Sequence, residues 1–129
     1  MVDVRFYMNK GKLCMKAEGH AKSAPKGEDL VCSGISALSV ALADTVTMMD
    51  EHGDLDCPPQ IIVGKDGLMT IKVRPKPEAA GKALLAFLFC QTGMIAIWRG
   101  YHEYISIKTF DKAELEAFSI EASSTLRTD

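Results

Sequence analysis

Apolar and polar residues alternate over the first seventeen positions, and this two-residue period constrains the fold more than any other feature. Every second residue of 2–8 is apolar, and the same pattern returns over 13–17. Successive side chains of a strand point to opposite faces, so each segment predicts a strand with one buried face. The residues between them, Asn-Lys-Gly-Lys at 9–12, are typical of a turn. The chain therefore opens with a β-hairpin.

A loop and a long helix are predicted next. Residues 19–28 lack apolar periodicity and contain glycine, proline and serine, which favours a loop. From Val31 to Met49 apolar residues recur at spacings of three and four, as on the buried side of a helix. Asp29 is the predicted N-cap, because its carboxylate can accept hydrogen bonds from the free amides of the first turn. The helix should end before Gly53.

The second half predicts three more strands and one more helix. The segments 61–63 and 68–73 flank a Gly-Lys-Asp-Gly turn and read as a second hairpin. A second helix is expected over 77–99, with Gly100 just beyond its C-terminal end. A last strand is expected over 104–110.

The predicted order is therefore ββαββαβ, an α+β domain over residues 1–110 with one antiparallel-rich sheet and two helices. The second helix is apolar on every side, and one sheet covers only one side of it. We predict that a second copy covers the other side in a homodimer, with burial inside the same chain as the alternative. The polar tail 111–129 is expected to begin as a short helix, where Asp111 and Glu114 resemble a capping box, and then to fray.

Charge and hydropathy limit the expected partners. The chain of 129 residues has 15 Lys+Arg and 17 Asp+Glu, a net charge of −2. A dedicated nucleic-acid binder needs a basic face that displaces counterions, so no nucleic-acid partner is expected. The longest uncharged run, 83–98, is shorter than the roughly 20 residues of a membrane span. The segment 1–5 is not the apolar core of a secretory signal. A cytoplasmic protein without membrane contact is predicted.

The cysteine pattern is also typical of a cytoplasmic protein. None of them forms a Cys-x-x-Cys pair, which favours free thiols in a reducing cytoplasm over a disulfide framework. No paired ligand spacing indicates a metal site, and no cofactor is expected. The cysteines are Cys14, Cys32, Cys57 and Cys90.

Both ends of the predicted loop carry a residue that can do chemistry. His20 directly follows Gly19 at the end of a strand, and Cys32 falls in the first turn of the predicted helix. Free amides and the helix dipole favour a thiolate at that place, and a nearby imidazole can move its proton. Taken alone, a histidine and a cysteine twelve residues apart are more often a turn residue and a packed thiol.

The segment resembles the signature of the Prp family of ribosomal-processing cysteine proteases. Residues 19–38 read GHAKSAPKGEDLVCSGISAL, in which Gly-His-Ala is followed after a spacer by Gly-Glu-Asp-Leu-Val-Cys. The resemblance implies a dimeric α+β enzyme of bacteria. Members of the family remove a short N-terminal extension from large-ribosomal-subunit protein number twenty-seven, just after an aromatic-containing motif. Ser33 stands where alanine is usual, and the tail beyond residue 110 has no counterpart.

The resemblance also implies roles for individual residues. Cys32 is the nucleophile and His20 the general base, with the N-terminal peptide of a ribosomal protein precursor as substrate. Four further positions match the motif, two as supporting residues and two as hinges of a mobile loop: Asp29 and Ser36, and Gly19 and Gly27.

Two other functions remain as alternatives. One is a non-catalytic dimeric module that binds a ribosomal protein or an assembly factor. The other is a thiol-dependent enzyme of a different reaction type, such as a transferase or a deamidase. A protease predicts that Cys32 is the fastest thiol to be alkylated near neutral pH, whereas a binding module predicts no such order among the cysteines.

Overall fold

The computed structural model describes the backbone of residues 1–19, 26–64 and 69–127. The strands are β1 (Val2–Asn9), β2 (Lys12–Glu18), β3 (Gln60–Val63), β4 (Met69–Val73) and β5 (Ile105–Lys108). The helices are α1 (Lys26–Glu51), α2 (Ala80–Tyr101), which a short 3-10 turn η1 (Pro77–Ala79) precedes, and α3 (Lys112–Arg127). The order ββαββαβα confirms the predicted α+β class and adds a third helix in the tail.

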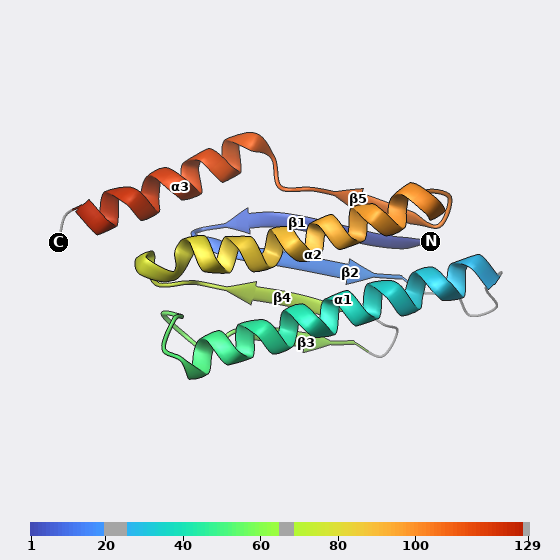
Figure 1. Cartoon of the computed structure of the whole chain (residues 1–129), viewed down its shortest axis with the longest axis horizontal. Coiled ribbons are helices and arrows are strands. Elements are labelled where there is room, and N and C mark those ends of the chain that lie inside the picture. Colours follow the sequence, from blue (N-terminus) through green and yellow to red (C-terminus); the bar gives the residue numbers. More distant parts are fainter. Residues whose placement is uncertain (20–25, 65–68, 128–129) are drawn as a thin grey trace.

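The strands form one sheet in the order β3-β4-β2-β1-β5. Helices α1 and α2 pack against each other across one face of it (Figure 1). Both predicted hairpins pair antiparallel, although residues 65–68 of the second turn lie outside the described residues. The last strand is shorter than predicted and pairs parallel with β1, with Val2 opposite Ile105. The N-terminal strand is therefore an inner strand of the sheet.

The helix ends differ from the predictions at three of four places. Helix α1 begins at Lys26, so Asp29 lies inside it and the prediction of Asp29 as N-cap is wrong. The missed signal is Pro25, because proline is favoured at the start of a helix. The predicted end is confirmed, since Gly53 has a positive φ of 77°. Helix α2 begins three residues late and continues through Gly100, which is therefore not its C′ residue.

Helix α2 is buried on one side only. Its inner residues Phe87 and Met94 are fully buried, and the Phe87 ring lies 6.4 Å from that of Phe110. On the outer side Leu85 is 67% and Phe89 75% exposed. Burial of every side within one chain is therefore excluded, and the homodimer stays a prediction.

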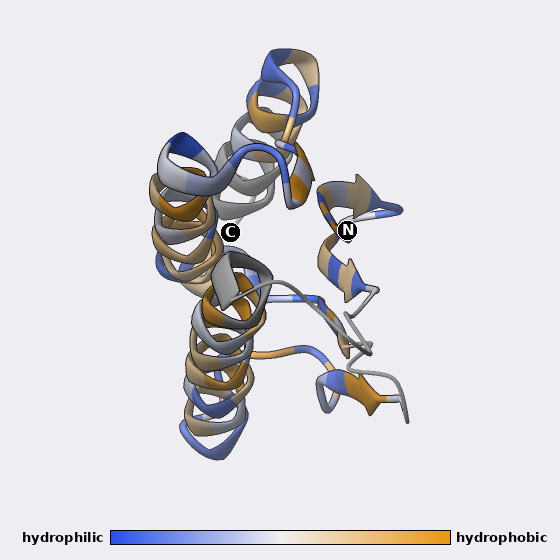
Figure 2. Cartoon of the chain, turned by 90° about the vertical axis from the view of Figure 1, so that its right-hand side faces the viewer, coloured by the Kyte–Doolittle hydropathy of each residue, from blue (hydrophilic) through white to orange (hydrophobic). Residues whose placement is uncertain are grey.

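Two helical segments are long and apolar enough to cross a membrane by length and composition alone. They are Leu30–Glu51 and Pro77–Tyr101. Long core helices of soluble proteins pass the same test, and both α1 and α2 pack on the sheet (Figures 1 and 2). The absence of a membrane contact remains a prediction.

The tail is helical through Arg127 and does not fray where predicted. Its capping box is confirmed, since the Glu114 amide donates to Asp111 Oδ1 at 2.7 Å and the Asp111 amide donates to Glu114 Oε1 at 3.2 Å. The second oxygen of Glu114 accepts from the amide of Met8 at 2.8 Å, beyond the point where β5 stops pairing with β1. One carboxylate therefore joins the tail to the sheet.

We expect Glu114→Ala to lower the free energy of unfolding by about 1–3 kcal/mol, because it removes a cap and leaves the Met8 amide without its acceptor. Urea unfolding followed by circular dichroism measures the loss. Glu116→Ala is the matched control on the exposed part of the same helix and should change stability by less than about 0.5 kcal/mol. Equal effects of the two substitutions would show that the contact to β1 contributes nothing.

Candidate functional site

Cys32 lies in the second turn of α1, six positions beyond Lys26. The prediction that it occupies the first turn is wrong, because the helix begins earlier than expected. Its side chain is partly buried and packs against the core, while the adjacent Val31 is fully buried. The thiol thus stands at the border between core and solvent.

Gly19 directly follows β2, which ends at the end of the molecule where α1 begins (Figure 1). Its φ is +100°, and a Cβ added there would collide with the carbonyl oxygen of Met1. Only glycine fits such a place without strain. His20, the predicted general base, is the next residue along the chain and lies outside the described residues. The backbone that leads to His20 is therefore fixed by Gly19.

The remaining motif residues are spread along the start of α1. Gly27 lies inside the helix, so its predicted place in the loop is wrong. The side chain of Asp29 is outside the described part of the structure, and its supporting role stays a prediction. Ser36 is exposed one turn beyond Cys32, on the same side of the helix by its spacing of four.

Ser39 is a polar residue of this helix that the sequence did not single out. It is 2% exposed, and its Oγ has no hydrogen-bond partner among the described residues. Its spacing of seven from Cys32 places it on the same side of α1. The signal for it in the sequence is a serine at an otherwise apolar helical position.

The other three cysteines lie in different surroundings. Cys14 and Cys90 are buried in β2 and α2, and Cys57 is exposed in the loop before β3. Burial raises the pKa of the Cys90 thiol to about 12. Burial also raises the pKa of Cys14, against the opposing charges of Lys72 and Lys12. Neither buried thiol is suited to act as a nucleophile.

We expect the order of alkylation by iodoacetamide at pH 7 to be Cys32 first, then Cys57, with Cys14 and Cys90 far slower. Mass spectrometry of tryptic peptides measures each rate. Cys57 is the internal reference for an exposed thiol without an activating neighbour. In His20→Ala the rate of Cys32 should fall to that of Cys57 or below, because the imidazole that takes its proton is gone. A Cys32 rate no higher than that of an unfolded cysteine would contradict activation.

Helices α1 and α2 cross closely near the site. A Cβ on Gly34 would lie 2.9 Å from Cδ1 of Ile97, so this glycine allows the last turns of α2 to reach the start of α1. The aromatic residues of these turns remain accessible, with Trp98 44% and Tyr101 37% exposed. The Trp98 ring packs edge-on against His102 at 6.3 Å. An exposed aromatic surface therefore lies at the same end of the helix pair as Cys32.

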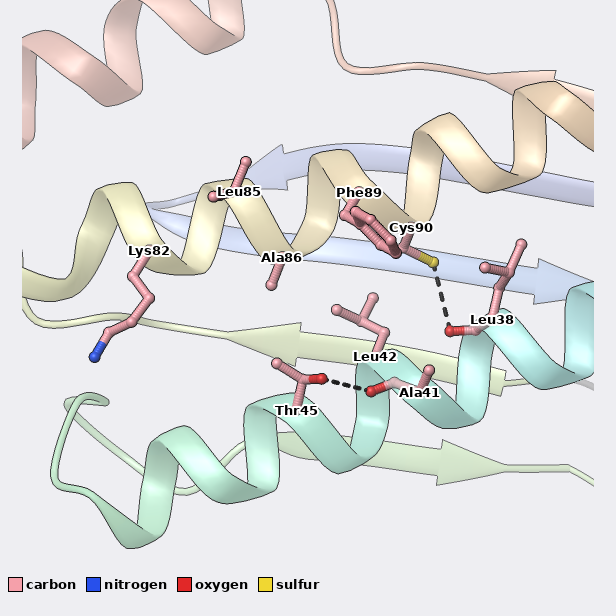
Figure 3. A pocket seen from close by; sticks show the side chains of 9 residues that line it. All are labelled: Leu38, Ala41, Leu42, Thr45, Lys82, Leu85, Ala86, Phe89 and Cys90. Carbon is pink, nitrogen blue, oxygen red and sulfur yellow. Dashed lines mark hydrogen bonds between the residues drawn. The ribbon is translucent and has the colours of Figure 1, made fainter.

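A groove of about 380 Å³ lies further along the two helices. Figure 3 shows Leu42 of α1 and Ala86 of α2 pointing toward each other between the helices, and Leu85 and Phe89 of α2 also line the groove. Cys32 is not among its lining residues. Among the described residues, the groove is thus separate from the predicted nucleophile Cys32.

The chain has clear relatives. Residues 1–106 match the family described as cysteine protease Prp. The ribosomal processing cysteine protease Prp of Bacillus subtilis (strain 168) is 28% identical over 109 residues, which cover 82% of this chain and 93% of that protein. SMU.848 from Streptococcus mutans has a TM-score of 0.64 at 25% identity and covers 85% of this chain and 94% of its own.

A further solved structure is similar in fold. It is an essential ribosomal processing protease Prp from S. aureus in complex with a substrate peptide. Its TM-score is 0.65 at 23% identity, and the match covers 84% of this chain and 99% of that one. The sheet and the two packed helices are therefore a shared architecture, and the matched family region ends before α3.

Proposed function

The chain belongs to the cysteine protease Prp family, and on this premise we propose that it cuts the N-terminal extension from the precursor of large-ribosomal-subunit protein number twenty-seven. The relative from Bacillus subtilis is named as a ribosomal processing cysteine protease. The observation that carries the proposal is the position of Cys32, which is partly accessible in the second turn of α1, at the end of the molecule where β2 leads to His20.

The proposed reaction uses Cys32 and His20 in two steps. His20 takes the proton of the Cys32 thiol, and the sulfur bonds to the scissile carbonyl carbon. The carbon–nitrogen bond then breaks, and the leaving amine receives the proton from His20. In the second step His20 takes a proton from water, the resulting hydroxide attacks the thioester, and the carbon–sulfur bond breaks. The proton returns to the sulfur, which restores the enzyme.

The proposal also assigns the remaining parts of such a mechanism to the surroundings of these two residues. The backbone amides at the start of α1 are the proposed donors to the oxyanion, since the first amides of a helix have no partner within it. The segment between Gly19 and the helix is proposed to close over the peptide, with Asp29 and Ser36 as supporting residues. No cofactor takes part in this scheme.

The test is cleavage of a peptide that spans the N-terminal extension of the host's own ribosomal protein, followed by mass spectrometry. Wild type should cut one bond, just after the aromatic-containing motif, and His20→Ala should not cut. No cleavage by folded wild-type protein would favour the alternative, a non-catalytic module that binds a ribosomal protein. Cleavage at many bonds would contradict a processing function.

We also propose that the active form is a cytoplasmic homodimer joined through the outer side of α2. The exposed Phe89 and Leu85 border an apolar groove between two helices, and exposed apolar residues gathered in this way favour a partner. Phe89→Glu should convert the dimer to a monomer in sedimentation velocity runs. Ile62→Glu is the matched control, because Ile62 is 57% exposed on edge strand β3. A monomeric wild-type protein at micromolar concentration would reject the dimer.

A further inference from the structure

The face of the sheet that α1 and α2 leave open is strongly basic. Figure 2 shows both helices on one side of the strands. Because side chains alternate along a strand, the residues between the buried apolar ones point to the opposite, open face. The cations at these positions come from four strands: Arg5 of β1, Lys12 and Lys16 of β2, Lys72 of β4 and Lys108 of β5.

Three of these cations stand next to each other across three strands. Arg5 is the register partner of Lys16 on β2 and of Lys108 on β5. Neighbouring strands are about 4.8 Å apart, so three positive charges fall within roughly 10 Å. Like charges in directly opposite positions destabilise a sheet. An arrangement that costs stability in the free protein suggests a bound anion.

Two carboxylates of the same face neutralise this row only in part. Arg5 Nε lies 3.1 Å from Asp3 Oδ2, and Lys16 Nζ lies 3.8 Å from Glu18 Oε2. The side chains of Arg5 and Lys16 nevertheless remain 58% and 40% exposed. The described strand positions of this face thus have five cations against two anions, a charge of +3 in a chain whose net charge is −2. The rest of the chain carries the compensating −5.

A hollow on this face lies between the three cations of this row and an aromatic ring. It has a volume of about 310 Å³ and is lined by Arg5, Tyr7, Lys16 and Lys108. Tyr7 is partly exposed two residues beyond Arg5 on β1, beside Cys14 of β2. Among the described residues of the five strands it is the one aromatic residue at an outward position. Cations and an accessible ring therefore border the same hollow.

The net charge of the chain predicted no nucleic-acid partner, but it does not show that positive charge gathers on one face. We propose that this open face binds single-stranded RNA, with the phosphates on Arg5, Lys16 and Lys108 and a base stacked on Tyr7. Every nucleotide offers one phosphate charge and one flat ring, and sheet faces with aromatic residues bind RNA in this way. The backbone groups of the inner strands are already paired within the sheet, so a peptide on this face could bind only through side chains.

An anionic membrane fits the face less well. Membrane-surface binding needs apolar side chains beside the basic ones. Among the described outward positions of the five strands, Ile62 is the large aliphatic residue, and it lies at the far edge on β3. The predicted nucleophile Cys32 is on α1, which covers the other face, so bound RNA would leave it free.

The test is fluorescence anisotropy of a labelled twelve-nucleotide oligouridine RNA between 50 and 200 mM salt. We expect salt-dependent binding by wild type. The triple variant Arg5→Gln, Lys16→Gln, Lys108→Gln should lose at least about tenfold in affinity, and its log–log salt slope should be shallower by about 2. Tyr7→Ala should lose about tenfold with the slope unchanged, and Tyr7→Phe should bind like wild type.

The matched control is a second triple variant, Lys76→Gln, Arg99→Gln, Lys112→Gln, which removes three positive charges outside the strands. Equal losses in the two triple variants would overturn the proposal, as would a wild type that does not bind at 50 mM salt. Equal binding of polyglutamate, or stronger binding of phosphatidylglycerol vesicles, would overturn it in favour of an acidic polymer or a membrane. Peptide cleavage should stay unchanged in the face variant, so this result is independent of the proposed protease function.

Discussion

Cys32→Ala should abolish cleavage of the precursor peptide, with a loss of at least about a thousandfold in kcat/KM. Removing the nucleophile of a covalent mechanism leaves only binding and oxyanion stabilisation, and such losses are among the largest that single substitutions cause. The fold should survive, because the side chain is only partly buried. The melting temperature should therefore change by no more than a few degrees.

The matched control for this experiment is Cys57→Ala, which removes an exposed thiol from the loop before β3. It should retain full activity, and both variants should give the circular dichroism spectrum of wild type. Retained cleavage by Cys32→Ala would point to a different nucleophile or to a contaminating protease. Loss of cleavage in both variants would mean that thiol chemistry at Cys32 is not the cause.

Gly19→Ala should have the largest effect among the described glycine positions outside the helices. Its φ of +100° strains any other residue, and the added Cβ meets the backbone of Met1 and Val2, which cannot move as a side chain can. We expect the free energy of unfolding to fall by about 2 kcal/mol or more. Cleavage should fall at least tenfold, since the backbone that leads to His20 is displaced.

Gly11 provides the comparison, because it also has a positive φ, of 80°. The nearest atom to a Cβ there is the end of the flexible Arg74 side chain at 3.0 Å. Gly11→Ala should cost only the backbone strain, about 1 kcal/mol, and leave kcat unchanged. Urea unfolding and the peptide assay separate the two glycines. If both variants retained full activity, the position of Gly19 would not matter for His20.

The elements were predictable from local pattern, and their ends less so. Strict alternation of apolar and polar residues predicts a strand with one buried face, as found in β1 and β2. The pair Asp111 and Glu114 predicts a capping box at the start of a helix, as found in α3. The start of α1 was misplaced because Asp29 is a good cap by composition, whereas the helix had already begun after Pro25. Gly100 has the composition of a helix end, but α2 continues through it to Tyr101.

The candidate site residues could be named from the sequence, but their roles and their arrangement stay predictions. Their spacing alone did not decide whether His20 and Cys32 are catalytic, and only the resemblance to the family implied their roles. The close approach of Gly19 to the backbone of Met1 brings a strand end against the N-terminus, which no local pattern encodes. The row of Arg5, Lys16 and Lys108 could not be predicted without the parallel pairing of β5 with β1, which places Lys108 beside Arg5. Net charge does not show how charges divide between the two faces of a sheet.

That parallel pairing also determines when the protein can fold. The residues that it joins, Val2 and Ile105, are 103 positions apart in a chain of 129 residues. Closing so long a loop is slow compared with forming the two hairpins, and it cannot begin on the ribosome before the last strand has been made. Until then β1 keeps an unpaired edge beside β2, exposed to neighbouring chains. We therefore expect each newly synthesised molecule to complete its sheet only after β5 has been made.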